Sequence, residues 1–593
     1  MENNKINKGY LDENSPSFVV EYSDGFKDEI KKVDYAIANI ITDSLAAVSV
    51  KVEDLKRLRR DVQSIKFIEP RGVYVLQDIP PTSVDNINKI LINPYLNLSG
   101  QGVVVGLIDS GIDYLNEEFI REDGTSRILK IWDQSIENKE SLSLGQVYDN
   151  NQINQAINAY REGKDPYEIV PSKDEEYHGS QMASIIGARG YNEQVKGIAN
   201  DCEFVVVKLI PSSNYRKILL ENNLKPVPVY NNSEVLAAIE FLRKTKSEIR
   251  KPMIFYFGVG SHEGAHDGNN ITARYISYIA TRRGIVVVSG TGNCALSEGH
   301  ALGDIPAVDA VNTVELLITK PMKYFNLDIW IKEPDRMSLK IISPAGEVGE
   351  FIDKSVEEEK KMKFIFTDTT VQVNGFNPEK FTGHQLYTID FRDIKSGVWK
   401  FELRGEYIVN GRFDIWLKDK SLLSEGTRFL QSNSDTTLTI PSTANNTITV
   451  ATYNENTKSI ASFSGRGFNS NGLINPDITA SGVNILTVSK NKGESTTVTG
   501  SSVATAIVAG ALALLLEWGV VKGNDRTINS IKARSILAYS GKRQSNEEYP
   551  NKESGYGLLD ILEGFKILGG EYRSSEMYRE YYINKLFIRR PNK

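Results

Sequence analysis

The segments that most constrain the fold of this 593-residue chain are three apolar runs, each bordered by small polar residues. Two of them, 103–108 and 285–288, are short runs of Val, Ile and Leu with the length of a buried parallel strand. The third, from Val503 to Trp518, is long enough to form a helix and is apolar on nearly every face. Because it is short for a membrane span, we interpret it as a core helix and expect no membrane span. The pattern predicts an α/β domain with a parallel sheet flanked by helices.

A reactive side chain stands at the edge of each of three segments. Asp109 ends the first strand, His178 opens His-Gly-Ser-Gln-Met-Ala, and Ser502 precedes the apolar helix. A serine hydroxyl becomes a nucleophile when an imidazole takes its proton, and an ionised carboxylate orients that imidazole. Taken singly, the three motifs are typical of a turn, a surface residue and a loop. Their order and context favour a catalytic triad of Asp109, His178 and Ser502.

An oxyanion donor is also expected near this triad. Asn293 follows the strand 285–290, and its side-chain amide is predicted to donate to the oxyanion together with the backbone N–H of Ser502. An Asn after a glycine is, by itself, typical of a turn. The position of Asn293 between the His and Ser segments favours the catalytic interpretation.

These segments resemble the subtilase family of serine endopeptidases. The matching segments are 102–111, His-Gly-x-x-x-Ala at 178–183, 475–482 and Gly-x-Ser-x-Ala with the run 508–516. A narrower resemblance, to the Csp germination proteases of spore-forming clostridia, rests on 263–268, 290–293, 507–510 and 514–518. The resemblance implies a subtilisin-like fold and a hydrolase that cleaves peptide bonds through an acyl-enzyme on Ser502.

The resemblance also points to the substrate cleft. It implies that Gly258 and Gly260, at the end of the strand 255–260, bind substrate together with Gly290 and Gly292. Several residues depart from the family pattern without removing a triad group: Gln181, Ser501, Ala506 and the strand Phe-Tyr-Phe-Gly-Val-Gly at 255–260. Rate and substrate preference therefore stay open.

Changes of pattern divide the chain into four parts. Residues 1–77 are predicted to form a small α+β unit that resembles the family's propeptide. Residues 78–311 and 448–593 are predicted to form two parts of the catalytic domain, the second with a C-terminal tail. Residues 312–447 show period-two strands, which predict an inserted antiparallel sandwich resembling the jelly-roll insert of Csp proteases. Asn410-Gly411 between two such strands predicts a hairpin. The insert is expected to provide rigidity and partner contact, or merely to stabilise the protein.

The end of the first part is a predicted processing site. By resemblance, the strand ending at Gln77 lies in the substrate cleft, and self-cleavage is expected between Gln77 and Asp78, within two or three residues. A bound product of this kind would mean that the pocket accepts Gln. The alternative is an uncleaved linker.

Composition narrows the functional classes. A net charge of −6 without clustered basic residues gives no indication of nucleic-acid binding. The two cysteines, Cys202 and Cys294, cannot supply a disulfide framework and suit a reducing or sheltered compartment. Cys294 is expected to be a packed thiol rather than a nucleophile. No cofactor or metal-ligand spacing is predicted, and calcium sites cannot be read from the sequence.

The resemblance further implies a biological role. The first residues lack a basic start and an apolar core, so we expect no secretory signal, synthesis in the cytoplasm and packaging in the cortex or coat region of a spore. The implied substrate is the precursor of a spore cortex-lytic enzyme, activated during germination; further partners are the chain's own propeptide and pseudoprotease paralogues. The alternatives are a pseudoprotease that relays a germination signal and a housekeeping intracellular subtilase.

Overall fold

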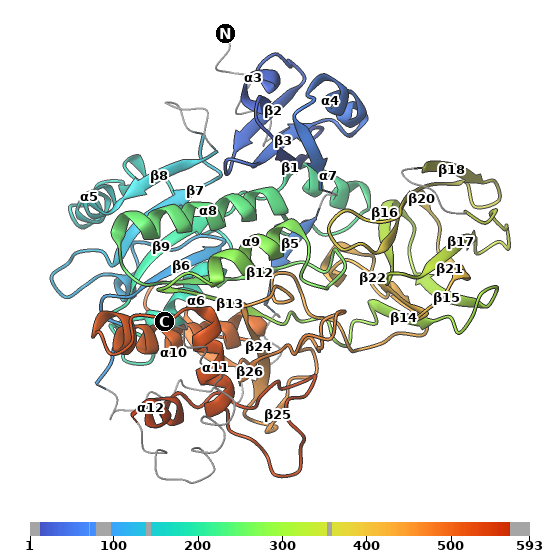
Figure 1. The fold of residues 1–593 in the computed structure, drawn as a ribbon. Helices are drawn as coiled ribbons and strands as arrows, with labels where there is room; N and C mark the ends of the chain where they lie inside the picture. Colours follow the sequence, from blue (N-terminus) through green and yellow to red (C-terminus); the bar gives the residue numbers. More distant parts are fainter. Residues whose placement is uncertain (1–11, 70–71, 79–96, 138–143, 353–357, 570–593) are drawn as a thin grey trace, which may run out of the picture.

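The computed structural model describes residues 12–69, 72–78, 97–137, 144–352 and 358–569 (Figure 1). Its centre is a nine-stranded sheet in the order β25-β24-β13-β11-β6-β9-β7-β8, with β26 beside β24. In this order, the strands from β24 through β13, β11, β6 and β9 to β7 are parallel to one another, which confirms the predicted subtilisin-like α/β fold. The strands are β6 (Val104–Asp109), β7 (Ile128–Asp133), β8 (Gln146–Asp149), β9 (Glu203–Lys208), β11 (Met253–Phe257), β13 (Ile285–Gly290), β24 (Ile448–Asn454), β25 (Ser459–Ile460) and β26 (Ile478–Ser481).

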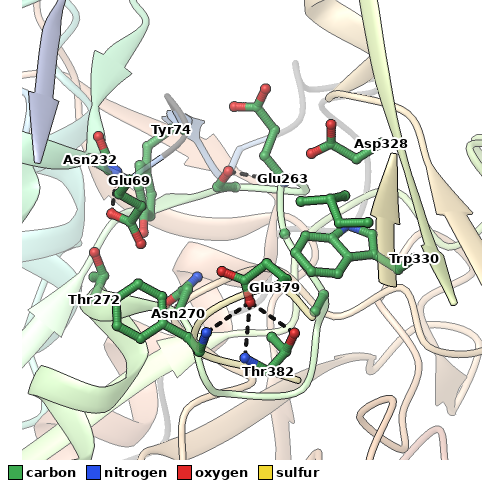
Figure 2. Close-up of a pocket in the computed structure, with 16 residues that line it drawn as sticks. Glu69, Tyr74, Asn232, Glu263, Asn270, Thr272, Asp328, Trp330, Glu379 and Thr382 are labelled. Atoms are coloured by element: carbon green, nitrogen blue, oxygen red, sulfur yellow. Dashed lines mark hydrogen bonds between the residues drawn. The ribbon is translucent and has the colours of Figure 1, made fainter. Parts of the chain in front are cut away.

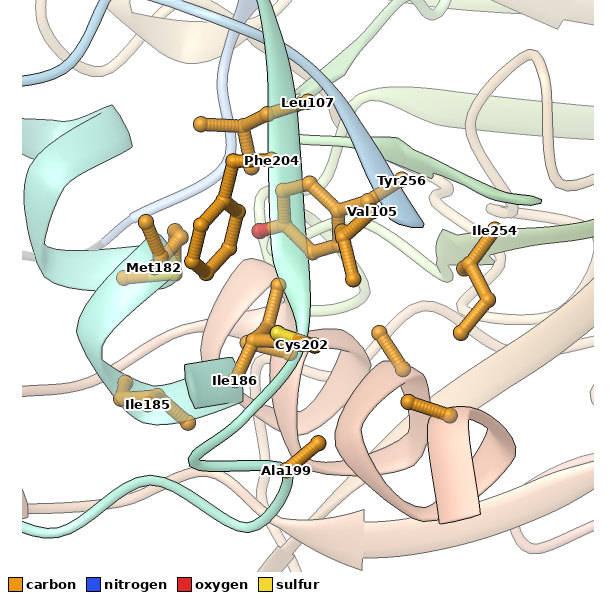
Figure 3. Close-up of a cluster of buried hydrophobic side chains, with 14 of the residues drawn as sticks. Val105, Leu107, Met182, Ile185, Ile186, Ala199, Cys202, Phe204, Ile254 and Tyr256 are labelled. Carbon is orange, nitrogen blue, oxygen red and sulfur yellow. The ribbon is translucent and has the colours of Figure 1, made fainter. Parts of the chain in front are cut away.

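Helices cover both faces of this sheet because its central strands are apolar on both sides. Alternate residues of β6 contribute to two separate cores. Val105 and Leu107 face α6 and α10, where Figure 3 shows them with Met182 and Phe204. Ile108 belongs instead to the core under α8 and α9. The helices of this domain are α5 (Asn150–Arg161), α6 (His178–Gly187), α7 (Ser213–Glu221), α8 (Asn232–Ile249), α9 (Ile271–Ala280), α10 (Ser501–Leu516), α11 (Ser530–Ser540) and α12 (Ile561–Gly569).

The helix that follows Ser502 is the most apolar one in the described part of the chain. The most apolar 18-residue window of its extension Ser501–Val521 has a mean hydropathy of 2.0, so by length and composition alone this helix could cross a membrane. In the structure 83% of its most apolar window is buried inside the protein. The helix therefore packs as a core helix, between α6 and the central sheet strands.

The N-terminal domain has its own sheet and core. The strand order is β2-β3-β1-β4, and the elements are β1 (Ser17–Tyr22), α3 (Phe26–Ile30), β2 (Ala36–Ile40), β3 (Leu45–Val50), α4 (Leu55–Asp61) and β4 (Ile65–Ile68). One face of the sheet forms a core of its own, with Phe26 and Leu58. The other face, with Val19 and Ala47, packs into the core beneath α8. The domain thus sits on the outside of the catalytic sheet, as Figure 1 shows in blue.

The insert is an antiparallel two-sheet structure. Its sheets have the orders β14-β22-β16-β20-β19-β18 and β17-β21-β15-β23 and enclose one core (Figure 1, right). The strands are β14 (His300–Asp304), β15 (Val311–Ile318), β16 (Met322–Ile331), β17 (Arg336–Ile342), β18 (Glu358–Phe364), β19 (Thr369–Phe376), β20 (Gln385–Ile394), β21 (Gly397–Tyr407), β22 (Arg412–Trp416) and β23 (Arg428–Phe429).

The insert differs from the sequence prediction in two respects. Its strands run from His300 to Phe429 rather than over 312–447, and the chain beyond β23 returns to the catalytic domain, where Ile440 bridges Ser261. The hairpin predicted at Asn410-Gly411 is wrong, because β21 and β22 belong to different sheets. The Asp335 carboxylate accepts hydrogen bonds from the backbone N–H groups of 409–411, which stabilises this crossing between the sheets.

Candidate active site

The fold brings Asp109, His178 and Ser502 together from three separate elements. Asp109 is the last residue of β6, His178 the first of α6 and Ser502 the second of α10. His178 Nδ1 lies 2.7 Å from Asp109 Oδ1, and His178 Nε2 lies 3.1 Å from Ser502 Oγ. All three side chains are at most 2% exposed. This is the arrangement in which an imidazole can take the serine proton while a carboxylate orients it.

Two glycines permit this close approach. A Cβ added to Gly258 would lie 1.7 Å from Asp109 Oδ2, so a larger residue would displace the carboxylate. A Cβ on Gly179 would lie 2.1 Å from the carbonyl oxygen of Gly111. The glycine after the triad histidine is therefore required because α6 begins in contact with the turn that follows β6.

The protonation of His178 is set by two opposing effects. Burial by itself lowers the pKa of His178, because it disfavours the imidazolium. The charge and hydrogen bond of Asp109 outweigh burial and raise the pKa to about 9. The folded pKa thus exceeds the unfolded value of about 6.5. This interaction contributes stability that is fully present below about pH 6.5 and is lost as the pH rises through about 9.

This balance predicts a titration that can be measured in the Ser502→Ala protein. We expect the His178 imidazole to titrate near pH 9 in NMR spectra of the histidine-labelled protein. Asp109→Asn in the same background should move the midpoint below 6.5, since burial then acts without the carboxylate. A midpoint below 6.5 before that substitution, or one that Asp109→Asn leaves unchanged, would contradict the assignment.

The segment after the N-terminal domain occupies the cleft as an extended strand. β5 (Val73–Leu76) pairs antiparallel with β10 (Tyr230–Asn231) on one side and with β12 (Val259–Gly260) on the other. The N–H of Gln77 continues this pairing by donating to the carbonyl of Gly258, at 3.1 Å. An extended segment held between two strands of the site is bound in the manner of a peptide substrate.

The carbonyl group of Gln77 lies at the candidate nucleophile. Its oxygen accepts hydrogen bonds from Ser502 Oγ at 2.7 Å and from the Ser502 N–H at 3.2 Å. That N–H is at the amino end of α10, where the helix dipole favours negative charge. The Gln77–Asp78 peptide bond is therefore the one presented to Ser502.

Asn293 lies beside this carbonyl in a supporting position. Its Oδ1 accepts a hydrogen bond from the Ser501 N–H at 2.9 Å, which fixes the amide plane next to the start of α10. Of the two predicted oxyanion donors, the Ser502 N–H contacts the Gln77 oxygen, whereas Asn293 contacts the adjacent backbone. With Oδ1 accepting, Nδ2 is the group of Asn293 that can donate to an oxyanion.

The Gln77 side chain fills a small polar pocket. Its Nε2 donates to Thr439 Oγ1 at 2.6 Å, and its Oε1 accepts from Ser501 Oγ at 3.4 Å. A Cβ on Gly260 would lie 1.7 Å from Nε2, and one on Gly290 would lie 3.0 Å from Oε1. The pocket therefore has the size and the hydrogen-bonding groups to hold a glutamine amide.

The four glycines predicted to bind substrate have different surroundings. Gly260 and Gly290 contact the Gln77 amide, and the carbonyl of Gly258 accepts from its backbone. Gly292 instead packs against Thr439, where a Cβ would lie 2.5 Å from the methyl group. Sequence reasoning missed Thr439 because it lies in the stretch predicted as insert, and no local motif connects it to a site formed by residues far away in the chain.

A pocket lies at the junction of the N-terminal domain, the catalytic domain and the insert (Figure 2). Glu69 accepts from the N–H of Ile271 at 3.0 Å and from Asn232 Nδ2 at 2.8 Å, at the starts of α9 and α8. Burial raises the pKa of Glu69 to about 7. Glu263 accepts from the N–H of Val73, and its other oxygen lies 2.8 Å from Lys418 Nζ of the insert. The N-terminal domain is thus bonded to the catalytic domain through residues on both sides of positions 70–71.

Comparison with known proteins identifies the class. The family model described as the subtilase family matches residues 100–316 and 420–557, which together make up more than half of the chain. These segments contain the sheet, α6 and α10 with their reactive side chains. The chain belongs to the subtilase family, and it is a serine protease.

A solved structure shows which group within the family this chain resembles. The Clostridium perfringens CspB protease is 30% identical, with a TM-score of 0.71, and the match covers 81% of this chain and 95% of that chain. This similarity supports the predicted resemblance to the Csp group. A PII-type proteinase of Lactococcus lactis subsp. cremoris is 26% identical over 172 residues, and one of Lacticaseibacillus paracasei is 24% identical. The match to each of these proteinases covers 28% of this chain and 9% of the relative's length.

Proposed function

We propose that this protein is a self-processing serine endopeptidase that cleaves its own chain between Gln77 and Asp78 and then activates another protein by limited proteolysis. Ser502 is the nucleophile, His178 the base and then the acid, and Asp109 the group that orients His178. The observation that carries the proposal is the Gln77 carbonyl oxygen, 2.7 Å from Ser502 Oγ and within the cleft.

The cleavage follows from the contacts around the Gln77 carbonyl. Ser502 Oγ attacks the carbonyl carbon while the neutral form of His178 takes the hydroxyl proton at Nε2, and the Ser502 N–H together with Asn293 stabilises the oxyanion. His178 then protonates the nitrogen of Asp78, which leaves as a new amino terminus. Water releases Gln77 from the acyl-enzyme. The N-terminal domain, as a propeptide, keeps its contacts through Glu69 and β5.

The proposed substrate follows from the similarity to the Csp group and from the pocket. We propose a spore cortex-lytic enzyme precursor, cut after a glutamine during germination, by a protease packaged in the spore. Thr439 and Ser501 favour an uncharged amide, because both present hydroxyl groups to it. A narrow pocket suits a protease with few targets.

Intact mass of the purified wild-type protein beside Ser502→Ala tests self-processing. We expect the wild type as two pieces, one ending at Gln77 and one beginning at Asp78, and Ser502→Ala as one whole chain. A wild-type chain that stays whole would overturn the proposal and favour a pseudoprotease that acts by binding. A break that persists in Ser502→Ala would show cleavage by another protease.

A second measurement tests the proposed substrate. The processed protein is mixed with a purified cortex-lytic enzyme precursor from a clostridial spore, and the new termini are sequenced. We expect a single cut after a glutamine, which the Ser502→Ala protein does not make. Absence of a cut by a protein that has processed itself would remove this substrate and leave self-processing standing.

A further inference from the structure

Cys294 lies in a cluster of three side chains that the proteolytic mechanism does not use. One potential ligand atom each from His262, Cys294 and Asp419 lies within 4.8 Å of the other two. Cys294 is 5% exposed and His262 is 7% exposed, whereas Asp419 is partly exposed. The three residues come from the loop after β12, the position after Asn293 and the segment after β22. The cluster therefore joins the substrate cleft, the oxyanion loop and the insert.

His262 has an unused ring nitrogen at this place. Within the described part of the chain, its buried Nε2 has no hydrogen-bond partner. A buried polar atom without a partner costs free energy, so this nitrogen is available to a ligand that approaches it.

Cys294 and Asp419 already contact each other. The thiol donates to Asp419 Oδ2, with 3.2 Å between sulfur and oxygen. Burial, and then the charge of Asp419, raises the pKa of Cys294 well above its ordinary value, so the unoccupied thiol keeps its proton and is not a nucleophile. A divalent cation would replace that proton between the sulfur and the carboxylate.

The sulfur–oxygen distance suits zinc-like coordination, and a ring nitrogen of His262 lies within 4.8 Å of both atoms. Zinc binds thiolate, imidazole and carboxylate at about 2.3, 2.0 and 2.0 Å in a tetrahedron, which places sulfur and oxygen ligands about 3.5 Å apart. The separation of 3.2 Å between Cys294 Sγ and Asp419 Oδ2 needs only a small adjustment. Three protein ligands leave the fourth position to water. Calcium and magnesium are less suitable, since they prefer oxygen ligands.

The neighbouring residues hold the cluster in place without a metal ion. Lys418 and Glu263, next to Asp419 and His262, form an ion pair at 2.8 Å with side chains 12% and 13% exposed. Asp419 Oδ1 accepts from the N–H and Oγ of Ser421, which leaves Oδ2 for the cluster. The sulfur and the carboxylate are therefore positioned in advance, and His262, whose ligand atom lies within 4.8 Å of both, completes the set.

We propose that His262, Cys294 and Asp419 form a binding site for one divalent cation of the zinc class. The bound cation links the insert to the residue that follows Asn293, and so fixes the backbone on the oxyanion side of the cleft. Glu263, which follows His262, accepts a hydrogen bond from the Val73 N–H and so connects the site to the segment after the N-terminal domain.

Cobalt binding to the whole, tag-free Ser502→Ala protein tests the site. One equivalent of Co²⁺ added to metal-free protein should give a thiolate-to-cobalt charge-transfer absorption and the visible bands of four-coordinate cobalt, both removed by one equivalent of Zn²⁺. Cys294→Ala should abolish the charge-transfer absorption. Cys202→Ala is the matched control, because Cys202 is also buried but lies outside the cluster, and it should leave the spectrum unchanged.

Two further measurements keep the test decisive. Asp419→Asn retains an oxygen that can accept from Ser421 and alters a partly exposed residue, so it should fold and bind cobalt more weakly. Zinc should raise the melting temperature of the protein and of Cys202→Ala, but not that of Cys294→Ala. No charge-transfer absorption in the unsubstituted cluster, or one that survives Cys294→Ala, would overturn the proposal.

Discussion

Asp109→Asn is expected to leave the chain almost unprocessed while preserving its fold. An asparagine can fill the space of Asp109 and still contact His178 Nδ1, but it favours the wrong imidazole tautomer and removes the charge that stabilises the imidazolium. The rate of cleavage between Gln77 and Asp78 should fall by about 10,000-fold. The measurement is a time course of intact mass after cell-free synthesis of the two proteins.

The control for this prediction is Asp123→Asn. Asp123 is exposed and accepts hydrogen bonds from the nearby Thr125, so its substitution should leave the rate unchanged. Near-ultraviolet circular dichroism of Asp109→Asn should match that of Ser502→Ala. Wild-type processing by a correctly folded Asp109→Asn protein would show that His178 does not depend on this carboxylate.

Gly260→Ala is expected to block cleavage after glutamine. The new methyl group would lie 1.7 Å from Gln77 Nε2, so the side chain has to leave its pocket and loses the hydrogen bond to Thr439. Loss of a buried hydrogen bond and displacement of the side chain together cost about 3 kcal/mol. The rate of self-cleavage should fall by about 100-fold.

A rescue experiment separates this effect from a folding defect. Gln77→Ala in the Gly260→Ala protein removes the closest collision and leaves only Thr439 Cβ, at 2.9 Å, to shift, so cleavage at the same bond should recover in part. Gly72→Ala is the matched control, since the nearest atoms to its added Cβ lie 3.9 Å away. If Gly260→Ala is cleaved as fast as the wild type, or the double variant does not recover, Gly260 does not limit the pocket.

The elements that the sequence predicted correctly carry a local pattern. β6 and β13 are continuous apolar runs that end in small or acidic residues, and α10 is apolar on nearly every face, so their neighbours need not be known. The hairpin at Asn410-Gly411 fails for the opposite reason. Its turn motif is local, but the choice of sheet for β22 depends on pairing with β14 and β16.

The sequence by itself determined the class of protein, the identity of the triad residues and the central α/β sheet, because those features lie in short segments whose residue types are dictated by burial and chemistry. The tertiary structure alone decided the groups that contact the Gln77 side chain and the neighbours of Cys294. Thr439 reaches Gln77 only when the chain returns from the insert, and His262 and Asp419 meet Cys294 only where three separate loops converge. Contacts of this kind join residues far apart in the chain, and no periodicity or local spacing encodes them.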